Sequence, residues 1–280
     1  MSEFPMTWEE AVKWLREQPD QGDLVRDCFF DDPVRTAAER YHASGEWRAV
    51  REFLGPARGA ALDIGSGRGI SAFALAKDGW QTTALEPDPS DLVGAGAIRA
   101  LVADSGLPID IVSERGESLP FADSSFDLVH CRQVLHHASD LPQLCREVGR
   151  VLKPGGVFIA TREHVISTYD DLPAFLDRHP LHRLYGGEHA YLLKEYLEAI
   201  AGGGLAVTHC FNPFASEINR YPATMESIKK ALTQRLLGRF ARLVPARLVP
   251  DAFIVFAGSR INTPGRPFTF VARKPEKSGG

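Results

Sequence analysis

The sequence predicts an α/β protein with a mostly parallel sheet and helices on both of its faces. From Ala60 onward, short apolar runs alternate with amphipathic stretches, which is typical of repeated strand–helix units. The first of these runs leads directly into a glycine-rich turn that opens a helix. The composition is that of a globular protein, because 44% of the 280 residues are hydrophobic and 24% are charged.

The chain before the sheet is predicted to form a helical cap over residues 1–43. A helix is expected over Thr7–Gln18, because Thr7 and Glu10 form a capping box and Pro19 follows. A second helix is expected over Glu46–Leu54, near the start of the core domain that we assign to residues 44–211.

The core elements follow in regular order. Helices are expected at residues 70–78, 89–103 and 140–152, and the last of these is ended by a Lys-Pro-Gly-Gly turn. The apolar runs between and around them predict five strands, at residues 60–64, 81–85, 109–112, 126–130 and 156–161.

The alternation breaks down after residue 161. Residues 162–204 are predicted as a lid segment with helices at 173–177 and 189–201. Strands at 206–211 and 267–272 bring the total to seven. Residues 212–265 are predicted to hold a largely helical insertion that covers the acceptor site, since structureless loops of that length are uncommon. Residues 266–280 contain the last strand and a flexible tail.

Charge and cysteine content narrow the class of protein. A net charge of -4 creates no overall basic field, so we expect no nucleic-acid partner. The four cysteines are widely spaced and include no CxxC pair, so we expect them to be reduced thiols. The N-terminus lacks a continuous apolar stretch, and the run at 252–257 is far shorter than the roughly 20 residues of a bilayer span. We therefore expect a cytoplasmic protein without a transmembrane segment.

The strongest motif is the run Asp63-Ile-Gly-Ser-Gly-Arg-Gly69 after the first strand. Glycines in this turn let the backbone approach a ligand closely. The dinucleotide fingerprint needs its third glycine at the next position, where this chain has Ile70. Glu86 ends the following strand, where a carboxylate can accept hydrogen bonds from both hydroxyls of a ribose. The pattern favours a site for an adenosyl group without a pyrophosphate.

Together with LPFADSSFDLV, VLHH and REVGRVLKPGG, these motifs resemble the class I S-adenosylmethionine-dependent methyltransferase family (type 11-like domain) over residues 40–162. The resemblance implies a Rossmann-like sheet with a reversed last hairpin and S-adenosyl-L-methionine as the cofactor. It places the glycine turn beside the methionine part, Glu86 on the ribose, and residues 115–117 along the adenine. The cofactor-binding residues expected on this basis are Asp63, Gly65, Ser66, Gly67, Gly69, Glu86, Pro87, Arg115, Gly116, Glu117, Cys131 and Arg132. For Asp63 the alternative is a cap on the following helix.

Candidate acceptor residues follow the fourth and fifth strands. His136 and His164 are the catalytic candidates, because a histidine has a pKa near neutrality and can deprotonate an acceptor. The alternative is that the histidines pack and hydrogen-bond between the sheet and the next helix. No metal is expected, because the His and Glu spacing matches no established zinc motif. The candidate substrate-binding residues are His137, Arg162, Glu163, Tyr185 and His189.

Within the insertion, apolar residues recur at near-helical spacing beside the basic residues of segment 229–247. This helix is expected to cover the acceptor, and its basic side is a candidate for weak peripheral contact with an anionic membrane. The alternative is an ordinary helix with a solvated cationic face. The apolar residues concerned are Ile228, Leu232, Leu236, Phe240 and Leu243.

The predicted function is the transfer of a methyl group to an O, N or C atom of a small-molecule acceptor, with phosphorylated, glycan and lipid-linked acceptors included. One alternative is a non-catalytic module that binds an adenosyl ligand. The other is a nucleotide-dependent oxidoreductase, against which Ile70 counts.

Overall fold

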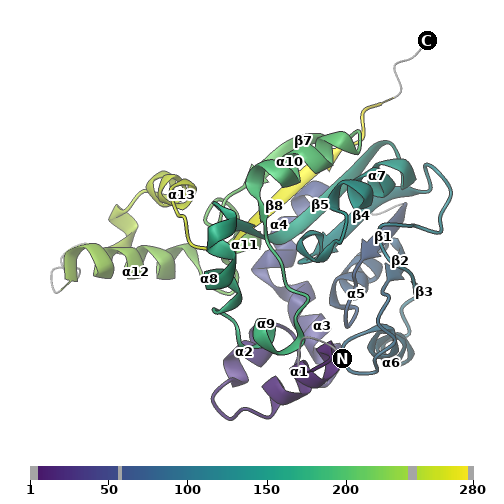
Figure 1. The fold of residues 1–280 in the computed structure, drawn as a ribbon, viewed down its shortest axis with the longest axis horizontal. Coiled ribbons are helices and arrows are strands. Elements are labelled where there is room, and N and C mark those ends of the chain that lie inside the picture. Colours follow the sequence, from purple (N-terminus) through teal and green to yellow (C-terminus); the bar gives the residue numbers. More distant parts are fainter. Residues whose placement is uncertain (1–5, 56–58, 239–244, 277–280) are drawn as a thin grey trace.

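The computed structural model describes residues 6–55, 59–238 and 245–276. Its centre is a twisted sheet with the strand order β3-β2-β1-β4-β5-β8-β7 (Figure 1). Strands β1 to β5 pair in parallel, and β8 runs antiparallel to both β5 and β7, so the predicted Rossmann-like sheet with a reversed last strand is confirmed. A two-residue strand, β6, adds to β5 beyond the seven predicted. The strands are β1 Ala60–Ile64, β2 Gln81–Leu85, β3 Ile109–Val112, β4 Phe126–Arg132, β5 Leu152–Ile166, β6 Tyr191–Leu192, β7 Ala206–Phe211 and β8 Arg266–Arg273.

Helices cover both faces of the sheet, because successive strand residues point to opposite sides. Ala61 packs in one core with the helices α3 to α5, whereas Leu62 packs in the other with α7 and α10. The helices of these layers are α3 Val34–Ala43, α4 Gly45–Leu54, α5 Ile70–Lys77, α6 Ala95–Ser105, α7 Leu141–Val151 and α10 Leu193–Gly202.

The N-terminal cap packs against the lid segment. Helix α1, Trp8–Arg16, begins with the predicted capping box of Thr7 and Glu10. Its residues Val12 and Leu15 share a small core with Leu181 of α9, Pro180–Tyr185. Helices α2, Gly22–Asp27, and α3 lie within the predicted helical cap, although the sequence pattern did not place them individually. This contact brings the N-terminus and the lid, which are distant in sequence, to the same side of the sheet.

Among the core elements, helix α6 and strand β5 differ most in length from the prediction. Helix α6 begins at Ala95 and not at residue 89, because the Ser90 hydroxyl accepts the backbone amides of Leu92 and Val93 and holds a turn there. Strand β5 continues to Ile166, since β8 pairs with it on both sides of the irregularity between Ala160 and Glu163.

The insertion does not cover the sheet edge as expected. Helices α12, Met225–Leu237, and α13, Asp251–Ser259, extend away from the body of the molecule (Figure 1). Helix α13 is attached to the body of the molecule, since Asn212 donates to the Val255 carbonyl at 3.1 Å and Ile254 is buried. Phe240 and Leu243 lie outside the described residues. The lid and insertion also contain α8, Leu172–Leu176, and α11, Glu217–Arg220.

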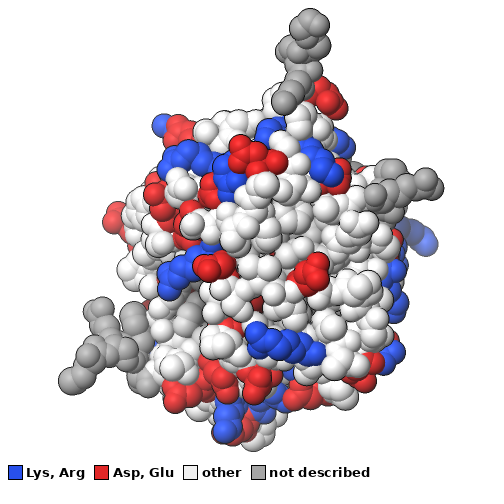
Figure 2. All heavy atoms as spheres, turned by 90° about the vertical axis from the view of Figure 1, so that its right-hand side faces the viewer, with Lys and Arg blue, Asp and Glu red and all other residues white. Residues whose placement is uncertain are grey.

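Figure 2 shows basic and acidic side chains interspersed over one face of the molecule. In α12, the predicted basic side is partly paired, because Lys229 contacts Asp251 and the Lys230 Nζ atom lies 2.7 Å from the Glu226 carboxylate. Among the described residues, no helix combines the length and the apolar character that crossing a membrane requires.

Candidate functional site

A cavity of about 1010 Å³ opens at the carboxyl ends of the parallel strands. Its floor is formed by the turns after β1, β2, β3 and β4, and His164 of β5 adds to it. The N-terminal cap supplies an apolar wall with Trp8, Phe29 and Phe30. In the described part of the insertion, only the two ends contribute, at residues 213–214 and 261–265. Helices α12 and α13 therefore do not cover the acceptor site, which corrects the predicted lid.

The turn after β1 is open to the cavity at one glycine and closely packed at another. Gly67 has a φ of +53°, and the atom nearest to a Cβ placed there is the Val93 carbonyl oxygen at 3.8 Å. Gly65 has a φ of +61°, but a Cβ there would lie 2.7 Å from the Val134 side chain. Both backbone conformations favour glycine. Gly67 thus presents bare backbone to a ligand, while Gly65 allows the turn to pack against the segment after β4.

Glu86 lines the cavity at the end of β2 and is only 8% exposed. Its Oε2 atom accepts the Gly67 amide at 2.7 Å, and its Oε1 atom accepts the Asp88 amide at 2.9 Å. Burial raises the pKa of Glu86 to about 7, against the opposite effect of these two hydrogen bonds. Each carboxylate oxygen can accept more than one hydrogen bond. Glu86 can therefore bind ribose hydroxyls while it holds the glycine turn in place.

Three predicted cofactor residues lie behind the cavity wall. Asp63 is fully buried, and its carboxylate lies 2.7 Å from both Ser71 Oγ and His130 Nδ1. Cys131 is part of the hydrophobic core. A Cβ on Gly69 would press on the side chain of Ile98. The expectation that these residues touch the cofactor is corrected, because their positions face the helix layers and support the wall from behind.

The loop after β3 forms the next part of the wall. Arg115, Gly116 and Glu117 all line the cavity, as does Pro87 after β2. Glu117 accepts hydrogen bonds from the Ser139 amide and hydroxyl, both at 3.0 Å. This loop is thereby held to the segment that leads into α7.

Arg132 lines the floor, but its guanidinium group is bound to other protein groups. Its Nε atom lies 2.6 Å from Oε1 of the fully buried Glu46, and the guanidinium stacks over Phe29. Arg162 lies 3.7 Å from the same carboxylate and donates to the Tyr221 carbonyl at 2.6 Å. Burial raises the pKa of Glu46, but the two arginines outweigh this effect and hold it below its ordinary value. Arg162 does not line the cavity, which corrects its assignment to the substrate site.

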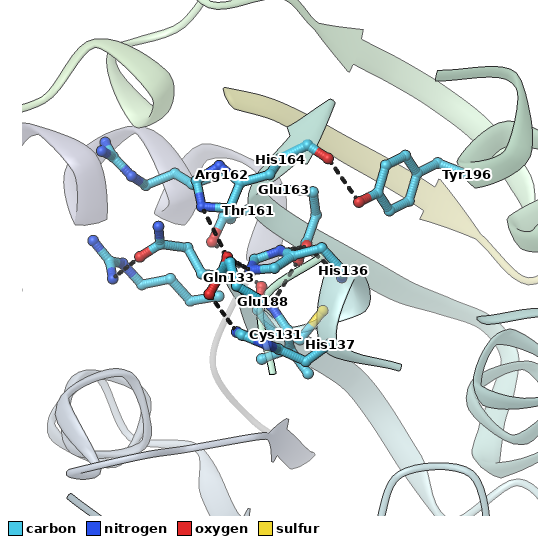
Figure 3. Close-up of polar contacts among 12 residues, drawn as sticks. Cys131, Gln133, His136, His137, Thr161, Arg162, Glu163, His164, Glu188 and Tyr196 are labelled. Carbon is cyan, nitrogen blue, oxygen red and sulfur yellow. Dashed lines mark hydrogen bonds and ion pairs between the residues drawn. The ribbon is translucent and has the colours of Figure 1, made fainter. Parts of the chain in front are cut away.

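Four histidines that line the cavity surround the Glu188 carboxylate, and Figure 3 shows three of them, His136, His137 and His164. Glu188 Oε1 lies 3.2 Å from His136 Nε2 and 3.7 Å from His164 Nε2. Glu188 Oε2 lies 3.8 Å from the Nε2 atoms of both His137 and His182. We call these five residues the histidine–glutamate cluster. It joins both predicted catalytic histidines with two residues, Glu188 and His182, that the prediction did not select.

Glu163 lies behind this cluster and is fully buried (Figure 3). Its Oε2 atom lies 2.7 Å from His136 Nδ1, and its carboxylate also accepts the backbone amides of Val134 and His136. Tyr196 donates to the His164 carbonyl at 2.8 Å. Glu163 therefore orients His136 and does not itself reach the cavity, which corrects its assignment as a substrate-binding residue.

The cluster contains groups in different protonation states. Burial lowers the pKa values of His137, His164 and His182, so these rings are neutral at pH 7. Burial also disfavours the charged form of His136, but hydrogen bonds to its two glutamate neighbours outweigh this effect and raise its pKa to about 9. For Glu188, burial acts to raise the pKa, yet the histidines outweigh it and lower the pKa. At neutral pH, the cluster thus holds a carboxylate, an imidazolium and three neutral imidazoles.

Of the two remaining substrate-binding candidates, Tyr185 and His189, one lines the cavity and the other does not. Tyr185 lines the cavity, and its hydroxyl donates to Glu188 Oε2 at 3.3 Å. His189 lies outside the cavity between Tyr169 and Tyr191, so its assignment is corrected. Glu188 could have been identified from the sequence, because a cluster of buried histidines needs a carboxylate nearby as a counter-charge. No sequence signal could have placed Trp8 in this wall, because its position depends on how α1 packs.

A model of the family described as "Methyltransferase domain" matches residues 62–160. A ubiquinone biosynthesis O-methyltransferase of Methylobacterium sp. is 34% identical over 130 residues, which cover 45% of this chain and 48% of that protein. This chain thus spans about half the length of that relative. The protein of the same name in Rhizobium etli is 30% identical over 199 residues, which cover 67% of this chain and 78% of that protein.

The fold is also that of solved methyltransferase structures. A structure described as a putative sarcosine dimethylglycine methyltransferase from Galdieria sulphuraria aligns with a TM-score of 0.58 and 19% identity. The alignment covers 95% of this chain and 99% of that one. The match to the Rhizobium etli protein extends over 199 residues, well beyond the glycine turn. On these grounds, the chain belongs to the class I S-adenosylmethionine-dependent methyltransferase family.

Proposed function

We propose that this enzyme transfers the methyl group of S-adenosylmethionine to an O, N or C atom of a small molecule, and that a hydroxyl oxygen is the preferred acceptor. The observation that carries this proposal is a single cavity lined by two chemically different groups of residues. One group is the bare backbone of Gly67 with the carboxylate of Glu86, and the other is the histidine–glutamate cluster.

The residues present fit the cofactor. Gly67 leaves room for a ligand against its backbone, and Glu86 offers free lone pairs to a ribose. Pro87 and residues 115–117 would line the adenosyl part, and Ser66 the methionine part. When bound, S-adenosylmethionine supplies a methyl group on a positively charged sulfur atom, which is already a good leaving group. The protein therefore needs chiefly to align the donor with the acceptor, which can contribute roughly 7 to 11 kcal/mol in favourable cases.

The size of the cavity supports a small acceptor beside the cofactor. Ligand pockets usually measure about 300 to 1,000 Å³, so a cavity at the upper end of this range can hold two small molecules. Aromatic side chains of the cap and lid, Phe30 and Phe175 among them, form an apolar wall. Such a wall favours a partly apolar acceptor and excludes water from the transfer.

The cluster provides a destination for the acceptor's proton. His164 is neutral and can accept a proton, whereas His136 already carries one at neutral pH. The negative charge of Glu188 stabilises an imidazolium ion beside it. The names of the two O-methyltransferase relatives are a further reason to prefer a hydroxyl acceptor.

A binding and turnover experiment tests this function. Calorimetry with S-adenosylhomocysteine and with NAD measures ligand preference, and detection of S-adenosylhomocysteine release measures turnover on a panel of hydroxylated, amino and carbon-acid small molecules. We expect binding of the adenosyl ligand, little binding of NAD, and turnover with hydroxylated compounds. Binding without turnover on any compound would favour the non-catalytic module, and preference for NAD would favour the oxidoreductase.

A further inference from the structure

The histidine–glutamate cluster has the geometry of a metal site. One ligand atom each from His136, His164 and Glu188 lies within 4.8 Å of the others. Two ligands of a tetrahedral ion with bonds of about 2.1 Å lie about 3.4 Å apart. The distances of 3.2 Å and 3.7 Å from Glu188 Oε1 to the Nε2 atoms of His136 and His164 are close to this value.

The outer nitrogen of each of three histidines is held by a hydrogen-bond acceptor. His136 Nδ1 faces Glu163 at 2.7 Å, His164 Nδ1 faces the Gly265 carbonyl at 3.0 Å, and His137 Nδ1 faces the carbonyl of Gly187 at 3.0 Å. A carbonyl can only accept, so we assign the proton of His137 and His164 to Nδ1. This arrangement orients metal-binding histidines in proteins, because it leaves the Nε2 lone pair free for an ion.

The same assignment leaves an electrostatic conflict inside the cluster. The Nε2 atoms of His164 and His137 then direct lone pairs at the Glu188 carboxylate across 3.7 Å and 3.8 Å. Hydrogen bonding between these pairs is absent at such distances. His182 adds a side chain that is only 10% exposed and whose Nδ1 atom has no hydrogen-bond partner. A cation between these groups would remove the conflict.

We propose that His136 Nε2, His164 Nε2 and Glu188 bind a divalent first-row transition-metal ion, with Glu163 as the carboxylate that orients His136. The ion takes the place of the proton on His136 Nε2, which is released to water on binding. Imidazole ligands suit zinc, copper, iron and nickel ions, and zinc is bound by glutamate carboxylates as well. His137 and His182 are available as further ligands. The sequence predicted no metal, because these ligands come from three separate segments and form no local spacing motif. Only the fold brings the segment after β4, the end of β5 and the lid together.

The site has a direct consequence for the acceptor, and this part rests on the proposed function. All three ligands line the same cavity as Glu86 and Gly67. An ion with three protein ligands keeps at least one position for another ligand, such as an acceptor oxygen. Coordination lowers the pKa of a bound hydroxyl, so it would replace His164 as the means of activating the acceptor. The class of acceptor would then be a hydroxyl compound with a second oxygen nearby that can chelate the ion.

Metal content provides the test. The whole 280-residue chain is dialysed against chelator, loaded with Zn²⁺ or Co²⁺ and dialysed again. Bound metal is quantified by elemental analysis and by the visible absorption of Co²⁺. Titration calorimetry with Zn²⁺ gives the affinity. We expect about one equivalent per chain, a loss of affinity of more than about 100-fold for His164→Gln and Glu188→Gln, and a loss of about 10- to 100-fold for Glu163→Gln.

Two controls keep the test decisive. His209→Gln, which removes an exposed histidine on β7, should bind metal like the wild type. Binding of S-adenosylhomocysteine reports whether each variant is folded. A wild-type protein that retains no metal, or cluster variants that bind metal as well as the wild type does, would overturn the metal site. Full methyl transfer by metal-free protein would overturn the metal's role but not the proposed function, whereas a metal-loaded protein without turnover would count against the function and not the site.

Discussion

Glu163 Oε2 lies 2.7 Å from His136 Nδ1, and the same carboxylate accepts the backbone amides of Val134 and His136. One fully buried group at the end of β5 thus orients the segment that follows β4. Both the proposed acceptor site and the proposed metal site depend on this relationship.

Glu163→Gln should therefore weaken catalysis more than cofactor binding. The amide keeps the size of the side chain but loses the charge that holds His136, and buried hydrogen bonds to charged groups contribute about 1.5 to 3 kcal/mol. We expect a lower kcat, a lower free energy of unfolding in denaturant titration, and an unchanged affinity for S-adenosylhomocysteine. The control is Glu198→Gln, whose side chain is 64% exposed and should change stability by less than about 0.5 kcal/mol. Equal effects of both changes would show that Glu163 has no special role.

Comparison of Gly67→Ala with Gly106→Ala should distinguish a lost ligand contact from backbone strain. Gly106 provides the matched control, because it also has a positive φ, of +70°, and an added Cβ would likewise have open space around it. Gly106 ends α6 and does not line the cavity. Both alanine variants should lose about 1 to 2 kcal/mol of stability through strain. Only Gly67→Ala should lose affinity for S-adenosylhomocysteine in calorimetry, by at least about 10-fold, or 1.4 kcal/mol. Equal affinities for the two variants would remove Gly67 from the cofactor site.

Cofactor affinity should depend on pH through Glu86. Its pKa of about 7 in the free enzyme means that half of the molecules carry a protonated Glu86 at that pH. The ionised carboxylate is the stronger acceptor for ribose hydroxyls, so the affinity should rise as the pH increases through 7 and level off above it. Calorimetry with S-adenosylhomocysteine measures this affinity from pH 5.5 to 8.5, a range that extends about 1.5 units on either side of the pKa.

The Glu86→Gln variant is the control for this pH dependence. Its side chain does not titrate, while the ionisations of the ligand remain the same as with the wild-type enzyme. The variant should bind more weakly at high pH and lack the rise through pH 7. If it reproduced the wild-type profile, the pH dependence would come from another group.

Glu46→Gln should be strongly destabilising. The carboxylate is fully buried between Arg132 and Arg162, and removal of one partner of a buried ion pair typically costs about 3 to 5 kcal/mol. The exposed pair of Arg35 and Glu39 provides the control, because Glu39→Gln should cost less than about 1 kcal/mol. Denaturant titration measures both changes. A loss of similar size in the two variants would contradict the role of the buried pair.

The ion pairs of Glu46 also predict how the stability of the protein changes at acidic pH. The pKa of Glu46 is lower in the folded protein than its ordinary value of 4.5, so the folded state favours the ionised form. Its contribution to stability is complete above about pH 4.5 and is lost as the pH falls through the folded-state pKa. In wild type, the free energy of unfolding should decrease below about pH 4.5 more steeply than in Glu46→Gln.

The sequence by itself determined the sheet and, within the proposed cofactor site, the glycine turn and Glu86. Strand and helix periodicity is local, so the alternating runs from Ala60 onward predicted the core strands in their correct order. The turn at Gly65 and Gly67 could also be predicted from local sequence, because glycine is the residue that adopts positive φ angles most readily. Glu86 was identifiable for the same reason, since its position at a strand end follows from the pattern around it.

Only the tertiary structure decided which polar groups meet. His136 and Glu163 are 27 residues apart, and Glu188 comes from the lid, so their contact depends on how β4, β5 and the lid pack together. The prediction that Asp63 and Cys131 contact the cofactor was wrong, because a motif does not show which side chains at the end of a strand face the cavity. The insertion is amphipathic in sequence, but its helices α12 and α13 extend away from the body of the molecule and do not line the cavity. Periodicity encodes which face of an element is apolar, whereas packing of the whole chain decides what that face contacts.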